Sequence, residues 1–113
     1  MQDIELFNFG VFDSRVHFPE RKRTAWRTVP RYEIDQYCED GGIANINGDV
    51  HPIKKGDLLF ARPGDRRRSD LHFTAQFLHF RTSDKRLIAL LDALPHYCNG
   101  LDLALLQGYI KEI

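Results

Sequence analysis

The stretch KKGDLLFARPG, residues 54–64, places a short apolar run between two turn signals. Gly56-Asp57 and Pro63-Gly64 supply the backbone freedom or constraint that tight corners need. The run between them, residues 58–61, is apolar on both faces, which is typical of a strand covered on both sides. The stretch therefore predicts a buried strand framed by two sharp turns.

More strand-like runs lie on either side of this stretch. Asn47-Gly48 predicts a tight hairpin turn between residues 43–46 and 50–53, because both residues tolerate positive φ. Residues 71–80 form the last and longest run. Three further runs are at residues 4–12, 15–18 and 32–38. Many short strands at such spacing indicate a sandwich or a barrel.

The apolar pattern becomes helical over residues 83–113. Ser83 is a candidate N-cap for a helix that runs to about Leu94 and is stopped by Pro95. The apolar stripe of this helix recurs at i, i+3, i+4 and i+7; it consists of Leu87, Ile88, Leu90, Leu91 and Leu94. A second helix is expected to open at Asn99 or Gly100, with an apolar face that includes Leu101, Leu105 and Tyr109.

Length and composition are those of one soluble domain. The 113 residues carry 16 basic and 16 acidic side chains, so a nucleic-acid binder that works through phosphate charge is not expected. Cys38 and Cys98 lack metal-like or redox-like spacing, and we expect free thiols in a reducing cytosol. Asp3 and Glu5 interrupt any signal peptide, and no run approaches the ~20 apolar residues of a membrane span. These features predict a cytoplasmic protein.

A series of short sequence motifs, here called landmarks, occurs in a defined order and spacing over about half of the chain. The landmarks are Arg27, Tyr32-Glu33-Ile34, Gly41-Gly42, Ile46-Asn47-Gly48, Lys55-Gly56-Asp57-Leu58-Leu59-Phe60, Pro63-Gly64 and His79-Phe80. In this respect the chain resembles the ligand-binding domain of the AraC family of bacterial transcription regulators. The resemblance implies a mainly β, cupin-like barrel of jelly-roll type over residues 1–80 and a helical dimerisation or linker segment over 81–113. It also implies a C-terminal helix-turn-helix domain, which is not among these 113 residues.

Histidine spacing argues against a metal site. Enzymatic cupins commonly hold a metal with a His-x-His pair, and this sequence has none. His72 and His79 are seven residues apart, so a regular strand places them on opposite faces. The later cupin histidine would fall near Arg67, and arginine is not a usual metal ligand. We therefore expect no metal, no cofactor and no catalytic residue, hence binding without turnover.

Strand alternation, together with the resemblance, selects the candidate ligand-binding residues. In residues 32–38, alternation is expected to point Gln36 inward on the face of Tyr32 and Ile34. In the last run, the family's sugar sensors imply that the face of Phe73 and Phe77 lines the pocket. The resemblance also implies a pocket arginine at Arg27. If a strand starts after the Pro63-Gly64 turn, alternation is expected to point Arg67 and Ser69 inward. The complete candidate set is Arg27, Gln36, Arg67, Ser69, Ala75, Phe77 and His79.

Several of these residues have a structural alternative. Gln36 could be satisfied by neighbouring backbone, His79 could be a core histidine, and Arg27 could be a surface residue. Trp26 is expected in the core, with closure of one end of the barrel as the alternative. The run Arg66–Arg68 hints at an anionic effector, although an exposed turn is the default for such a run.

The expected function is that of an effector-sensing domain. A small molecule, for example a sugar, is expected to bind in the barrel and to shift the arrangement of a homodimer or of an attached DNA-binding domain. The candidate dimer-interface residues are Leu87, Leu91, Leu94, Leu101, Leu105 and Tyr109. The alternative for both helices is that they cover the barrel. Two other functions stay open: a stand-alone cupin enzyme, such as an isomerase or dioxygenase, and a free-standing sugar-binding module.

Overall fold

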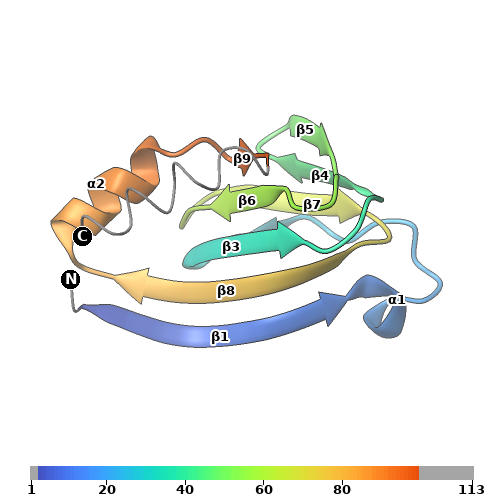
Figure 1. The fold of residues 1–113 in the computed structure, drawn as a ribbon, viewed down its shortest axis with the longest axis horizontal. Helices are drawn as coiled ribbons and strands as arrows, with labels where there is room; N and C mark the ends of the chain where they lie inside the picture. The colour runs from blue at the N-terminus through green and yellow to red at the C-terminus, as the bar shows by residue number, and fades with distance from the viewer. Residues whose placement is uncertain (1–2, 100–113) are drawn as a thin grey trace.

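The computed structural model describes residues 3–99 and is mainly β (Figure 1). The strands, in chain order, are β1 (Ile4–Asp13), β2 (Arg27–Thr28), β3 (Tyr32–Tyr37), β4 (Ile43–Ile46), β5 (Asp49–Pro52), β6 (Leu58–Ala61), β7 (Arg66–Asp70), β8 (Thr74–Thr82) and β9 (Tyr97–Cys98). The helices in this range are α1 (Ser14–His17) and α2 (Lys85–Ala93). Neither is long and apolar enough to cross a membrane.

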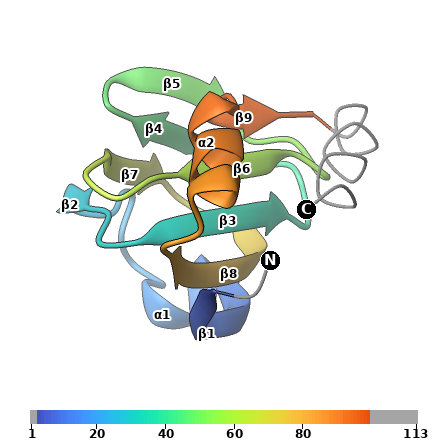
Figure 2. The ribbon, with the colours of Figure 1, turned by 90° about the vertical axis from the view of Figure 1, so that its left-hand side faces the viewer.

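The strands form two antiparallel sheets (Figure 2). The larger sheet has the order β1-β8-β3-β6-β9, and the smaller has the order β2-β7-β4-β5. Within residues 3–99 no ladder joins the two sheets into a closed barrel. The expectation of a mainly β fold is therefore confirmed, whereas barrel closure is not shown.

The main hydrophobic core lies between the two sheets. The larger sheet contributes Tyr37, Leu59 and Ala75, and the smaller contributes Ala44 and Ile46, all of them at most 1% exposed. Burial of this apolar surface is the principal force that holds the sheets together.

The stretch at residues 54–64 folds as predicted. All four residues of β6 are buried, and β6 lies between β3 and β9 in the larger sheet. Gly56 and Gly64 adopt φ of 88° and 94°, a region that favours glycine. The carboxylate of Asp57 accepts hydrogen bonds from the Lys54 backbone N–H and the His51 ring. The turn is thereby fixed by its own side chains.

The predicted hairpin at Asn47-Gly48 is also confirmed. Asn47 and Gly48 have φ of 56° and 90°, and Ile46 pairs with Asp49 across the turn. Positive φ at both central residues is the signature of the turn that matches the strand twist.

Helix α2 packs on the outer face of the larger sheet, which is the alternative to a dimer interface that the sequence left open for this helix. Leu87 and Leu91 are 7% and 8% exposed and form a cluster with Tyr32 of β3 and Phe80 of β8. Leu94 is partly buried against the same cluster. These leucines cover their own sheet because its outer face is apolar and needs a cover. The second predicted helix, with the interface candidates Leu101, Leu105 and Tyr109, is outside the described residues.

The cap of α2 differs from the prediction by one residue. Asp84, not Ser83, is the N-cap, and its carboxylate accepts hydrogen bonds from the backbone N–H groups of Arg86 and Leu87. Both residues are good caps by type, so only the backbone geometry selects between them.

The predicted strand at residues 15–18 is wrong, because residues 14–17 form the short helix α1. Asp13 caps this helix by accepting from the Arg15 N–H. The last strand begins at Thr74 rather than at residue 71, since Leu71 and Phe73 bond instead to helix α1 and to the loop that follows it. Leu71 N–H donates to Lys22, and Phe73 N–H donates to the Ser14 hydroxyl.

Candidate ligand-binding cavity

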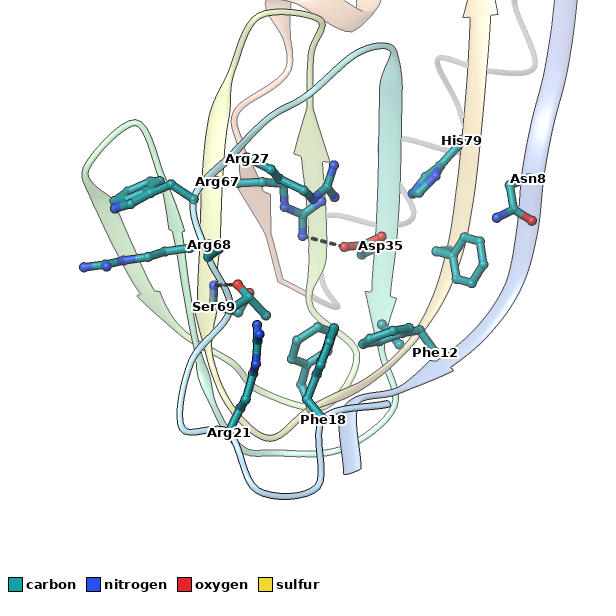
Figure 3. A pocket seen from close by; sticks show the side chains of 16 residues that line it. Asn8, Phe12, Phe18, Arg21, Arg27, Asp35, Arg67, Arg68, Ser69 and His79 are labelled. Atoms are coloured by element: carbon teal, nitrogen blue, oxygen red, sulfur yellow. Dashed lines mark hydrogen bonds and ion pairs between the residues drawn. The ribbon is translucent and has the colours of Figure 1, made fainter. Parts of the chain in front are cut away.

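A cavity of about 460 Å³ opens between the two sheets (Figure 3). Strands β1, β3 and β8 line it from the larger sheet, and β2 and β7 line it from the smaller. Residues 18–26, the loop between α1 and β2, close another side. The lining residues are Asn8, Phe12, Phe18, Arg21, Thr24, Ala25, Trp26, Arg27, Asp35, Arg67, Arg68, Ser69, Phe73, Ala75, Phe77 and His79.

A buried network of ion pairs crosses the cavity from one sheet to the other. Arg67 of β7 donates to Glu33 at 2.9 Å and to Asp35 at 2.7 Å, both on β3. Arg27 forms a bidentate pair with Glu33 at 2.6 and 2.9 Å. The Glu33 and Asp35 side chains are 2% and 8% exposed, and that of Arg67 is 7% exposed, whereas that of Arg27 is 47% exposed. Charges this deeply buried need such pairing to be tolerated.

The pKa values of the network follow from this pairing. Burial by itself would raise the pKa of Glu33, but the hydrogen bonds from Arg27 and the charge of Arg67 leave it below its ordinary value. Burial would likewise lower the pKa of Arg67, and Asp35 together with Glu33 instead holds it above its ordinary value. Glu33 is therefore ionised and Arg67 charged at neutral pH.

Two uncharged polar side chains, His79 and Asn8, point into the cavity from neighbouring strands (Figure 3). Burial lowers the pKa of His79 below its ordinary value of 6.5, although Glu33 opposes this shift from 3.9 Å. The imidazole is therefore neutral at pH 7 and can donate one hydrogen bond and accept another. Asn8 pairs with His79 in the ladder between β1 and β8.

Aromatic rings form the apolar wall of the cavity. The ring of Phe12 lies 5.6 Å from that of Phe73 and 6.2 Å from that of Phe18, in tilted arrangements. Phe77 and Ala75 extend this wall along β8. The wall offers flat apolar surface to the body of a bound molecule.

The cavity mouth carries guanidinium groups without acidic partners. The guanidinium of Arg21 lies 5.3 Å from the Phe18 ring centre, and that of Arg68 lies 4.7 Å from the Trp26 ring centre. Within residues 3–99 neither Arg21 nor Arg68 forms an ion pair with a carboxylate. Arg21 points into the cavity, whereas Arg68 points away from it (Figure 3).

The structure brings six of the seven candidate ligand-binding residues to this cavity. They are Arg27, Arg67, Ser69, Ala75, Phe77 and His79. The inward parity of Arg67 and Ser69 is confirmed, since both are buried. Trp26 is 37% exposed at the cavity mouth, so its expected place in the core is wrong.

Gln36 is the candidate that does not line the cavity, because the predicted faces of β3 are inverted. Glu33, Asp35 and Tyr37 are buried toward the other sheet, while Tyr32 and Ile34 pack toward α2. Alternation was predicted correctly, but the apolar face was assigned to the inside. The charged face of β3 can be buried between the sheets because Arg67 pairs with its carboxylates, and α2 covers the apolar face.

Sequence reasoning missed the acidic pair and the loop of residues 18–26. Glu33 and Asp35 occupy alternate positions in a strand, and Arg67 of the arginine-rich run at residues 66–68 reaches both from the other sheet. A carboxylate pair at i and i+2 beside inward-facing arginine was the available signal of a buried network. For the loop residues Phe18 and Arg21, the sequence holds no comparable signal.

The described residues contain no group of three or more His, Cys, Asp or Glu side chains arranged to hold a metal ion. Cys38 is exposed and Cys98 is buried.

Comparison with known proteins yields little. No protein-family model matches the chain, and no curated protein matches it. Among solved structures, the chain is similar to the plu4264 protein from Photorhabdus luminescens, with a TM-score of 0.45 and 18% identity. The match covers 60% of this chain and 59% of that one. A likeness at this level establishes neither fold type nor function.

Proposed function

We propose that this chain is the effector-sensing domain of an AraC-type regulator, cupin-like in fold, which binds a small molecule between its sheets without turnover. The cavity of about 460 Å³ carries this proposal. Its volume is in the range of about 300–1,000 Å³ that small-molecule sites occupy, and a mostly apolar lining with a few polar groups is typical of them.

The lining also favours binding over chemistry. The carboxylates of Glu33 and Asp35 are engaged by Arg27 and Arg67, so neither is free to act as a base. These fixed charges define the shape and polarity of one wall. The network thus serves to hold the site in one geometry before a ligand arrives.

A route from the cavity to the C-terminal part of the chain passes through β3 and β8. On β3, Glu33 faces the cavity side while its neighbour Tyr32 packs under α2. On β8, His79 lines the cavity while its neighbour Phe80 packs under α2. A ligand that shifts either strand moves the surface on which α2 rests. Such coupling requires that the ligand bind the two arrangements with different affinity.

The dimer and the DNA-binding half belong to the same proposal. Leu101, Leu105 and Tyr109 remain the dimer candidates after Leu87 and Leu91 proved to be buried in their own chain. Sequencing the coding region beyond Ile113 tests the proposal that the chain is part of a regulator. Helix-turn-helix periodicity there supports the proposal, and a stop codon immediately after Ile113 contradicts it.

Binding is tested by a thermal-shift screen of sugars and small acids, with Trp26 fluorescence as a second readout. Trp26 is the single tryptophan of the chain and lies at the cavity mouth, so its emission reports occupancy. We expect at least one compound to raise the melting temperature and to shift this emission.

The matched control fills the cavity from its exposed rim. Ala25→Phe places a ring in the cavity and is expected to abolish binding, whereas Ala89→Phe on the exposed side of α2 leaves it intact. A flat response across a broad library, or binding that survives Ala25→Phe, contradicts the proposal.

A further inference from the structure

We propose that the ligand of this cavity is a small monocarboxylic acid with a flat aromatic body, whose carboxylate is bound by Arg21. This inference rests on the proposed function, because it names the chemical class that the same cavity takes. It is carried by the charges around the cavity, by the position of Arg21 and by the rings beside it.

The charges in and around the cavity do not balance. Four arginines, Arg21, Arg27, Arg67 and Arg68, face only two carboxylates, those of Glu33 and Asp35. Arg27 and Arg67 are paired with these two carboxylates. Of the other two, Arg68 points away from the cavity and Arg21 points into it, which leaves an excess of one positive charge at the cavity mouth. An anion is therefore favoured over a neutral sugar.

Arg21 is the arginine placed to meet that anion. Its side chain points into the cavity, and it has no carboxylate partner within residues 3–99 (Figure 3). Arg68 points away from the cavity and stacks on Trp26. A guanidinium offers paired donors that match the two oxygens of a carboxylate. The bound charge thus sits at the mouth and one such group suffices, which favours a monoanion.

The rest of the cavity fits a flat apolar body. The ring of Phe18 lies beside Arg21, and Phe12, Phe73 and Phe77 continue the wall inward. At another side of the cavity, Asn8 and His79 present uncharged polar groups that suit a hydroxyl on the body of the ligand (Figure 3). The deduced ligand is therefore an aromatic acid with a neutral hydrogen-bonding group on its ring.

The test compares three probes on the 113-residue chain: 3-(4-hydroxyphenyl)propionate, its primary amide and D-glucose. The acid and the amide have nearly the same shape and differ in charge. Binding is followed by Trp26 fluorescence and by melting temperature. We expect the acid to bind at least about tenfold more tightly than the amide, the difference that a charge-assisted hydrogen bond contributes.

Variants assign that difference to one side chain. Arg21→Gln is expected to reduce the affinity for the acid to that for the amide, while binding of the amide is unchanged. Arg21→Lys keeps the charge and is expected to restore part of the preference. Arg86→Gln, the same change on exposed α2, is expected to leave both affinities as they are. Melting temperatures of the free variants establish that each one is folded.

The contradicting results separate this inference from the proposed function. Equal affinity for acid and amide, tighter binding of glucose, or an equal loss of both probes in Arg21→Gln overturns the ligand class while the cavity remains a binding site. The ligand class also falls if no probe binds at millimolar concentration but the broader screen yields a ligand that Ala25→Phe excludes. If nothing binds in either experiment, both proposals fall.

Discussion

The guanidinium of Arg67 reaches from β7 to two carboxylates on the opposite sheet, at 2.9 and 2.7 Å. Its side chain is 7% exposed, so water cannot replace these contacts. Its neighbour in the network, Arg27, is 47% exposed and holds Glu33 from the edge. The two arginines make similar bonds in very different surroundings, and their contributions to stability should differ accordingly.

Replacing Arg67 by methionine is expected to lower the free energy of unfolding by about 3–5 kcal/mol, because Asp35 is left buried without its partner. Arg27→Met is expected to cost about 1 kcal/mol or less, since water screens that pair. Urea denaturation followed by circular dichroism measures both variants. Equal losses in the two would show that burial does not set the strength of these pairs.

At the scale of elements, helix α2 and the larger sheet cover each other's apolar faces. The outer face of β3 and β8 presents Tyr32 and Phe80, and the stripe of α2 presents Leu87 and Leu91. An amphipathic helix forms stably when such a stripe is buried. Here the burial is on the chain's own sheet, which leaves these leucines unavailable to a second copy.

Leu87→Ala is therefore expected to lower the free energy of unfolding by about 2–5 kcal/mol, as for other buried leucines, and to leave the oligomeric state unchanged. Arg86→Ala, an exposed change one position away, is expected to alter stability by no more than about 0.5 kcal/mol. Chemical denaturation and light scattering measure the two properties separately. A change of oligomeric state without a loss of stability would restore Leu87 to the dimer interface.

At the scale of the whole molecule, two titratable groups, the half-buried His79 and the buried Glu33, make stability depend on pH. The pKa of His79 is lowered from its ordinary 6.5, mainly by burial, so acid protonates the unfolded chain first. The pKa of Glu33 is lowered from 4.5, because Arg27 and Arg67 outweigh the effect of burial. In both cases the folded protein holds fewer protons over the affected range, and stability falls as the pH falls.

The urea midpoint is thus expected to decline in two steps as the pH falls. The first step begins near the ordinary His pKa of 6.5 and belongs to His79, and the second begins near 4.5 and involves Glu33. His79→Gln should remove the first step and keep the second. A constant midpoint between about pH 7 and pH 5, or an unchanged first step in the variant, would contradict this account.

Some of this architecture follows from the sequence alone. The buried β6 between its two turns and the Asn47-Gly48 hairpin depend on residues that are neighbours in the chain. The inward-facing positions of β7 and β8 can also be predicted. Side chains alternate between the two faces of a strand, so one residue of known orientation fixes the others. Alternation, with the family resemblance to select the inner face of β8, predicted five lining residues on β7 and β8, and the resemblance alone predicted Arg27.

Tertiary structure decided which face of β3 is inside. Alternation divides a strand into two faces but does not say which of them faces the other sheet. Pairing between Arg67 and two carboxylates, distant in the chain, made the charged face the inner one, and α2 covered the apolar face. The loop with Arg21 reached the cavity by the same kind of long-range contact, since Thr24 and Ser69 exchange hydrogen bonds across 45 residues. Local pattern thus set the elements, whereas partners distant in the sequence set the orientation of their faces.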